Sequence, residues 1–75
     1  MSEKILIQFG RAVRTVRRDR GISQERLADI CGLHRTYVSD IELGKRNISL
    51  ENIEKIAAAF SMSITELFTE VEKNT

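Results

Sequence analysis

The chain has 75 residues and a net charge of +1; 41% of its residues are hydrophobic, 31% are charged, and proline and tryptophan are absent. This length and composition indicate one small globular domain, residues 1–75, that is rich in helix and has a thin core, and they exclude a multidomain enzyme and a disordered chain. The charge is uneven, because residues 1–46 hold ten Lys or Arg and six Asp or Glu, whereas residues 47–75 hold two and five. Either this surface is ordinarily solvated or the N-terminal part serves an anionic polymer.

Hydrophobic periodicity and glycine positions divide the chain into five predicted helices. Three glycines each follow a segment of helical periodicity, at a point where a left-handed C-terminal residue is needed. These glycines are Gly21, Gly32 and Gly44. Ser23 caps the second helix, and Ser63 opens a capping box with Glu66. The predicted helices span about residues 3–20, 24–31 and 35–43, and two more begin at Ser49 and Ser63, so the fold class is all-α.

Two residues that often carry chemistry, Cys31 and His34, occur once each. One cysteine cannot form an internal disulfide, and the two residues together cannot build a His/Cys metal cluster. We therefore expect no metal and no cofactor. We also expect no small-molecule ligand and no enzyme activity, because a thin helical core offers no deep pocket and the chain has no nucleophile–base pair. No apolar run has the length of a signal peptide or a membrane span, which indicates a cytoplasmic protein.

Residues 23–43 have the spacing of a helix-turn-helix. A small side chain at Ala28 lets a second helix approach the first, and Gly32 allows the positive φ of a three-residue turn. Val38 and Ile41 then pack the wedge between the two helices. A helix held in such a turn protrudes from the domain and can enter the major groove of DNA. The alternative is an ordinary helical hairpin in a small bundle.

This motif and its surroundings resemble the phage-repressor and Cro-like helix-turn-helix family over about residues 5–70. The similar stretches are Gly21-Ile22-Ser23-Gln24-Glu25, Leu27-Ala28, Gly32-Leu33, Arg35-Thr36-Tyr37-Val38-Ser39, Ile41-Glu42, Gly44-Lys45-Arg46-Asn47, Ser49-Leu50-Glu51 and Ser63-Ile64-Thr65-Glu66-Leu67-Phe68. The resemblance implies a compact five-helix, lambda-repressor-like DNA-binding domain whose second and third helices form the helix-turn-helix.

Within that family, the small size and residues 35–39 resemble the controller proteins of restriction–modification systems. These are dimeric regulators that act on their own promoter and on that of the endonuclease gene. The implied function is a sequence-specific transcriptional regulator, activator or repressor, that binds a pseudo-palindromic operator as a homodimer. The alternative is a helix-turn-helix module that binds protein, as an adaptor or an antitoxin-like partner.

The third helix is the expected recognition helix, and its outer side carries Arg35, Thr36 and Ser39. The guanidinium of Arg35 can bind O6 and N7 of guanine together, and Thr36 offers a methyl or a hydroxyl group. Asp40 shares this side, where phosphates repel a carboxylate unless it accepts a hydrogen bond from cytosine N4 or pairs with Arg35. Its role stays open, as does that of His34 at the N-cap.

Residues that flank the third helix are expected to hold phosphates. Gln24 lies at the start of the second helix, where free N–H groups and the positive end of the helix dipole favour an anion. Lys45, Arg46 and Asn47 follow the third helix and match loop contacts of the resembling family; the two cations could also belong to a solvated turn. Tyr37 could pack its ring on the domain and give its hydroxyl to a phosphate, the alternative being a mostly structural role.

Two pairs of charged residues have roles that the resemblance implies. Arg17 and Glu42 match positions that join the first and third helices by an ion pair, the alternative being two independent surface charges. Glu25 and Asp29 lie four residues apart and share one face of the second helix. Acidic residues at matching positions contact RNA polymerase in some phage repressors, although here the pair can also serve solubility alone.

The C-terminal helix is more apolar than a short terminal element needs. Its large side chains exceed what one side of a thin core can use, which predicts a dimerisation segment over about residues 60–72. The alternative is that these side chains fill the core of the monomer. The predicted interface residues are Met62, Ile64, Leu67, Phe68 and Val71. Two-fold symmetry would place two reading helices about 34 Å apart, in successive major grooves.

Overall fold

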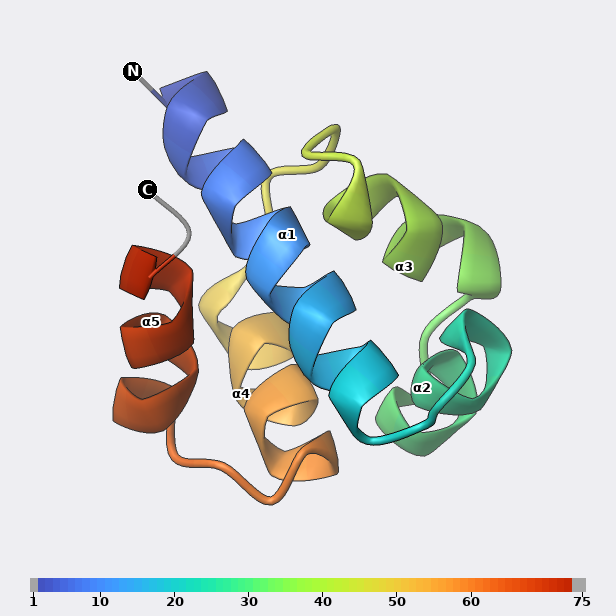
Figure 1. Cartoon of the computed structure of the whole chain (residues 1–75). Coiled ribbons are helices and arrows are strands. Elements are labelled where there is room, and N and C mark those ends of the chain that lie inside the picture. Colours follow the sequence, from blue (N-terminus) through green and yellow to red (C-terminus); the bar gives the residue numbers. More distant parts are fainter. Residues whose placement is uncertain (1, 74–75) are drawn as a thin grey trace.

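The computed structural model describes residues 2–73, which form five helices and the loops that join them (Figure 1). They are α1 (Ser2–Asp19), α2 (Gln24–Cys31), α3 (Arg35–Glu42), α4 (Leu50–Ala59) and α5 (Ile64–Lys73). Ser23 and Ser49 cap α2 and α4, because each Oγ accepts a hydrogen bond from the backbone N–H three residues later, at 3.0 and 3.1 Å. Ser63 and Glu66 form the predicted capping box. The bounds of α1, α2 and α3 agree with the predicted ones to within one residue.

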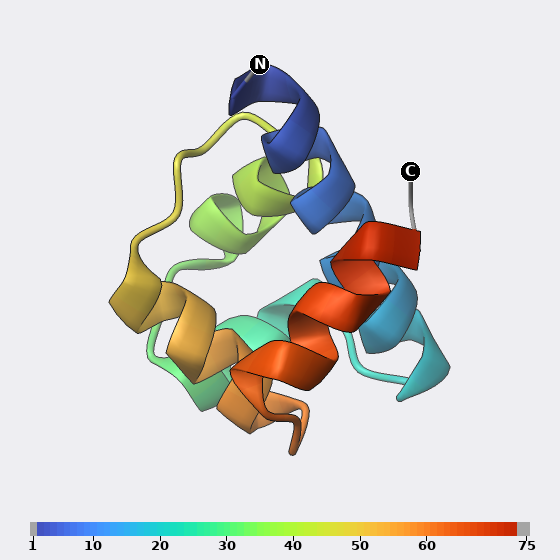
Figure 2. The ribbon, with the colours of Figure 1, turned by 90° about the vertical axis from the view of Figure 1, so that its left-hand side faces the viewer.

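α1 is the central helix of the packing. It runs across the face shown in Figure 1 with α5 on one side and α3 on the other, and Figure 2 shows α5 lying against it. α2 packs against α3 and α4, and α4 also packs against α5. The apolar faces that meet in this way form one core. Its largest fully buried side chains are Phe60, Leu27, Ile41, Ile56, Leu67, Val13, Val38 and Val71.

Gly10 marks the point where α1 crosses the C-terminal end of α3. A Cβ atom at this position would lie 2.3 Å from the carbonyl oxygen of Ile41 and 2.6 Å from that of Glu42. Both neighbours are backbone atoms of a helix and cannot swing aside as a flexible side chain does. Only glycine therefore allows the two helices to approach this closely, and the crossing sets the position of α3 on the domain.

The structure corrects part of the prediction for α5. Leu67 and Val71 are 0% and 1% exposed and belong to the core of the monomer, so they are not free to face a partner. The reason is that α5 packs against both α1 and α4. The core of the monomer therefore takes up more of the apolar side chains of α5 than the sequence pattern indicated. Ile64 stays 44% exposed, and Met62 and Phe68 are half-buried.

Cys31 is the last residue of α2, and its Sγ donates a hydrogen bond of 3.6 Å to the carbonyl oxygen of Lys55 in α4. Burial raises the pKa of the Cys31 thiol.

Within residues 2–73, no group of three or more His, Cys, Asp or Glu side chains is placed to hold a metal ion. None of the helices over the same residues has the length and apolarity needed to cross a membrane.

Candidate nucleic-acid interface

α2 and α3 form the helix-turn-helix that the sequence predicted. Gly32 adopts a left-handed conformation with φ 69° and ψ 31°, and the Leu33 N–H donates a hydrogen bond of 2.9 Å to the carbonyl oxygen of Ala28. Ala28 is 3% exposed, and Val38 and Ile41 are buried on the inner side of α3. The inner side of α3 is thus held against the domain, and its outer side stays accessible.

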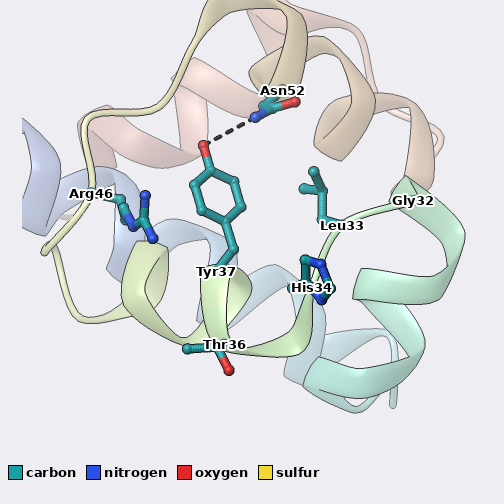
Figure 3. A pocket seen from close by; sticks show the side chains of 7 residues that line it. All are labelled: Gly32, Leu33, His34, Thr36, Tyr37, Arg46 and Asn52. Atoms are coloured by element: carbon teal, nitrogen blue, oxygen red, sulfur yellow. Dashed lines mark hydrogen bonds between the residues drawn. The ribbon is translucent and has the colours of Figure 1, made fainter.

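The outer side of α3 presents the residues predicted to read bases. Arg35 and Thr36 are exposed and Ser39 is half-buried. Together with Gln24 they line a hollow of about 240 Å³, and Figure 3 shows Thr36 pointing away from Tyr37, toward the outside. The structure therefore gathers a guanidinium, two hydroxyls and an amide on one surface, and these groups can match the donors and acceptors of base edges.

A buried ion pair supports one edge of this surface. Arg17 Nε and Nη2 donate to Oε2 and Oε1 of Glu42 at 2.6 and 3.1 Å, and Arg17 Nη1 donates to the carbonyl oxygen of Ile22 at 2.9 Å. The two side chains are 11% and 3% exposed, and the hydrogen bond to Glu42 raises the pKa of Arg17. Glu42 Oε1 also accepts a hydrogen bond of 3.0 Å from Gln24 Nε2. The expected pair is thus present, and it also orients Gln24.

A second edge is built around Tyr37 (Figure 3). The Tyr37 hydroxyl accepts a hydrogen bond of 3.0 Å from Asn52 Nδ2, and the guanidinium carbon of Arg46 lies 5.1 Å from the centre of the tyrosine ring. Arg46 Nε is 3.6 Å from Asp40 Oδ2. Asp40 therefore pairs with Arg46, and not with Arg35 as one of the two sequence interpretations had it. A hollow of about 490 Å³ lies beside these residues.

The loop after α3 folds back over the last turn of that helix. Gly44 has φ 73°, and the N–H groups of Gly44 and Lys45 donate to the carbonyl oxygens of Ile41 and Asp40 at 3.0 and 2.9 Å. The side chains of Lys45 and Asn47 are exposed. This loop therefore places three predicted phosphate-binding residues, Lys45 to Asn47, next to the outer side of α3.

Comparison with known proteins decides the family. A helix-turn-helix family model matches residues 13–67. The control protein C.BamHI of Bacillus amyloliquefaciens is 50% identical over 68 residues, which cover 89% of this chain and 84% of that protein. The control protein C.MunI of a Mycoplasma species is 46% identical, over 92% of this chain and 95% of that protein. The chain belongs to the helix-turn-helix family of control proteins.

Solved structures of related controller proteins have the fold of this control protein. The restriction–modification controller protein C.AhdI from Aeromonas hydrophila aligns with a TM-score of 0.82 and 48% identity, over 84% of this chain and 96% of that one. The C.Esp1396I tetramer in complex with its natural 35 base-pair operator aligns with a TM-score of 0.86 and 30% identity, over 93% and 92%. The lambda-repressor-like, five-helix expectation therefore holds for this control protein.

Two acidic residues and one apolar hollow complete the surface of this control protein. Glu25 and Asp29 are both exposed on α2. On the other side of the domain, Ile5 of α1 lines a hollow of about 460 Å³ together with Ile64 and Phe68 of α5. Ile5 is 45% exposed.

Sequence reasoning missed Asn52 and left His34 open. Asn52 of α4 donates a hydrogen bond to the hydroxyl of Tyr37, and no local sequence signal indicates this contact, because the two residues are 15 positions apart and meet only in the fold. His34 stands at the N-cap of α3 without a side-chain capping hydrogen bond, and its side chain is exposed beside Tyr37. The imidazole therefore lies at the N-terminal end of the outer side of α3.

Proposed function

We propose that this control protein binds operator DNA sequence-specifically as a homodimer and regulates transcription of its own gene and of a restriction endonuclease gene. The observation that carries the proposal is the outer side of α3, where Arg35, Thr36 and Ser39 stand between two edges that hold Gln24 and Arg46. The family of control proteins and the operator complex of the similar C.Esp1396I support the same assignment.

In this proposal α3 enters the major groove with its N-terminal half foremost. Arg35 binds O6 and N7 of a guanine, while Thr36 and Ser39 contact neighbouring base edges. Phosphates on both sides of the groove fix the register of the helix. The residues assigned to these phosphates are Gln24, Tyr37, Lys45, Arg46 and Asn47.

The two edges of the reading surface keep donors free for this purpose. One N–H of the Gln24 amide bonds Glu42, and the second is left to donate to a phosphate. The Tyr37 hydroxyl accepts from Asn52 and therefore keeps its own hydrogen atom for an acceptor. Both side chains are thus held in place before DNA arrives, which limits the entropy lost on binding.

The dimer surface that we propose is the accessible part of the predicted segment. This part consists of exposed Ile64 and half-buried Phe68 and Met62, in α5 and the turn before it. Ile5 extends the same patch onto α1. An apolar patch that pairs with its own copy generates a two-fold dimer. Two reading helices about 34 Å apart would then match the two halves of a pseudo-palindromic operator.

Activation is assigned to Glu25 and Asp29, which are exposed on α2. Phosphates give these carboxylates nothing to bind, whereas basic residues of RNA polymerase bound beside the operator would complement them. Neutralising both, as Glu25→Gln with Asp29→Asn, should lower promoter output at full operator occupancy. Unchanged output would mean that the pair only keeps the surface solvated.

A gel-shift titration of DNA from upstream of the protein's own gene tests the proposed function. The wild-type chain should shift this duplex at lower concentration than a shuffled duplex of equal length. Arg35→Ala should cost about 1–3 kcal/mol on the upstream duplex and relax the preference at one base pair. Arg11→Ala, which removes an exposed arginine from α1, is the matched control.

Two results would speak against the assignment. If Arg35→Ala weakens binding to both duplexes equally, Arg35 holds a phosphate and reads no base. If the wild-type chain binds the upstream and shuffled duplexes alike, the proposed function itself is wrong, and a protein-binding role for the helix-turn-helix takes its place.

A further inference from the structure

Asp40 pairs with Arg46 but has no role in the DNA contacts proposed so far. It follows Thr36 by four residues, one turn along α3, so both side chains project from the same outer side of the helix. Its side chain is 30% exposed. On the proposed function, this side faces the groove, where a bare carboxylate would be repelled by the phosphates of both strands. The charge needs an explanation.

Arg46 lies close enough to offset this charge and to favour one orientation of the carboxylate. The guanidinium lies 3.6 Å from Asp40 Oδ2 through its Nε and stacks over the ring of Tyr37 at 5.1 Å, and Asn52 in turn holds the Tyr37 hydroxyl at 3.0 Å (Figure 3). The backbone bond from Lys45 to Asp40 keeps the loop in place. Each contact limits the movement of the next one, so the carboxylate is oriented in the free protein.

The chemistry of this oriented carboxylate selects its partner. An ionised carboxylate only accepts hydrogen bonds, and the contact with Arg46 occupies the Oδ2 side, which leaves Oδ1 for a donor. In the major groove, guanine presents two acceptors and thymine presents an acceptor and a methyl group, so both oppose a carboxylate. Adenine presents an amino group next to the acceptor N7. Cytosine presents its N4 amino group, which is a donor, and fits best.

We propose that Asp40 is a base-reading residue that accepts a hydrogen bond from the N4 amino group of a cytosine, with Arg46 as the positioning residue that neutralises and orients it. This inference rests on the proposed function, because it requires α3 to lie in the major groove. It adds a fourth base contact, about one helical turn or 6 Å beyond Thr36.

The test is a selection from duplexes with a randomised half-site, followed by sequencing of the bound fraction. The wild-type chain should prefer cytosine at one position, by about tenfold over the other bases. Asp40→Ala should flatten the preference at that position to below about twofold. Asp40→Asn should move it toward adenine, because an asparagine amide matches the N6 and N7 groups of adenine together. Preferences at the other positions should stay unchanged.

Arg46 is tested at the same position. Arg46→Gln should weaken binding to every duplex and should also reduce the cytosine preference. In the Asp40→Ala background, Arg46→Gln should leave the base preference as it is, because the residue that it positions is absent. Asp19→Asn makes the same carboxylate-to-amide change at an exposed position of α1 and should alter no base preference.

Three outcomes overturn the inference. If the wild-type chain, Asp40→Ala and Asp40→Asn select the same sequences, Asp40 reads no base. If both variants tighten binding to all duplexes by one common factor, the carboxylate only repels phosphates. If the wild-type chain selects no sequence at all, the proposed function fails and this inference fails with it, a result that is distinct from the first two.

Discussion

Glu42 is a carboxylate on α3 that serves two other helices at once. It accepts two hydrogen bonds from Arg17 of α1 and one from Gln24 of α2, and its side chain is 3% exposed. The pair Asp40–Arg46 offers a direct contrast, because its side chains are 30% and 53% exposed. Buried and exposed ion pairs differ strongly in the cost of removing one partner.

Glu42→Gln should lower the free energy of unfolding by about 3 kcal/mol or more, because it leaves the buried guanidinium of Arg17 without its counter-charge. Asp40→Asn, the matched control, should cost less than about 1 kcal/mol. Urea titrations at one pH measure both values. A loss for Glu42→Gln as small as that for Asp40→Asn would mean that water screens the Arg17–Glu42 pair.

The pH dependence of this pair has a definite sign on the arginine side. The hydrogen bond to Glu42 raises the pKa of Arg17 above its ordinary value. A raised pKa in the folded state means that the contribution of Arg17 to stability is complete below the unfolded-state pKa and is lost only as the pH rises through the folded-state value. Arg17 should therefore add no change of stability between neutral and moderately alkaline pH.

At the scale of elements, the crossing of α1 and α3 at Gly10 decides where the reading helix sits. Gly10→Ala should lower the free energy of unfolding by about 1–3 kcal/mol or more, because the new Cβ meets the carbonyl oxygens of Ile41 and Glu42. Thr15→Ala, on the exposed side of the same helix, should leave stability nearly unchanged. Thermal unfolding followed by circular dichroism compares the two.

Operator affinity gives a second measurement of the Gly10→Ala effect. If α1 moves away to accommodate the methyl group, α3 tilts with it, and specific binding should fall more than binding to a shuffled duplex. A variant with the stability and the affinity of the wild-type chain would show that the helices slide apart without cost, contrary to the packing described.

The elements could be predicted from the sequence because their signals are local. The caps Ser23, Ser49 and Ser63 and the turn at Gly32 act within three or four residues, so the pattern alone places them. The role of Gly10 could not be predicted in this way, because nothing local shows that another backbone crosses there.

In the candidate site, too, features set by local sequence could be predicted, and contacts between distant segments could not. The outer side of α3 follows from periodicity, which a sequence displays directly. The ion pair Asp40–Arg46 and the hydrogen bond from Asn52 to Tyr37 depend on how a loop folds back and on which face of α4 lies nearby. The assignment of Leu67 and Val71 to an interface was wrong for a related reason: a stripe shows which residues are apolar but not how many neighbours cover them.

At the scale of the whole molecule, the monomer and the dimer should respond to different residues of α5. Ile64 is 44% exposed, whereas Leu67 is fully buried. Ile64→Glu should therefore leave the fold intact, since an acidic residue suits the first turn of a helix, and should convert the proposed dimer to a monomer. Leu67→Ala should instead lower the free energy of unfolding by about 2–5 kcal/mol.

Sedimentation at micromolar concentration and thermal unfolding separate these two effects. The monomeric Ile64→Glu chain should also bind a full operator less tightly than the wild-type chain, because the two half-sites are no longer bound by one linked unit. A stable dimer of Ile64→Glu would place the interface elsewhere than on the patch of Ile5, Ile64 and Phe68.

The burial of Cys31 allows the rate at which the folded protein opens to be measured by thiol labelling. The sequence holds one cysteine, which is 7% exposed and whose pKa burial raises, so a thiol reagent finds neither access nor thiolate while α2 and α4 stay packed. Labelling should therefore count opening events of the helix-turn-helix, one label for each molecule that opens. Operator DNA should lower the rate of labelling, because a ligand that binds only the closed form makes opening rarer. Alkaline pH should quicken it, since a thiol whose pKa is raised by folding favours the open form as the pH rises.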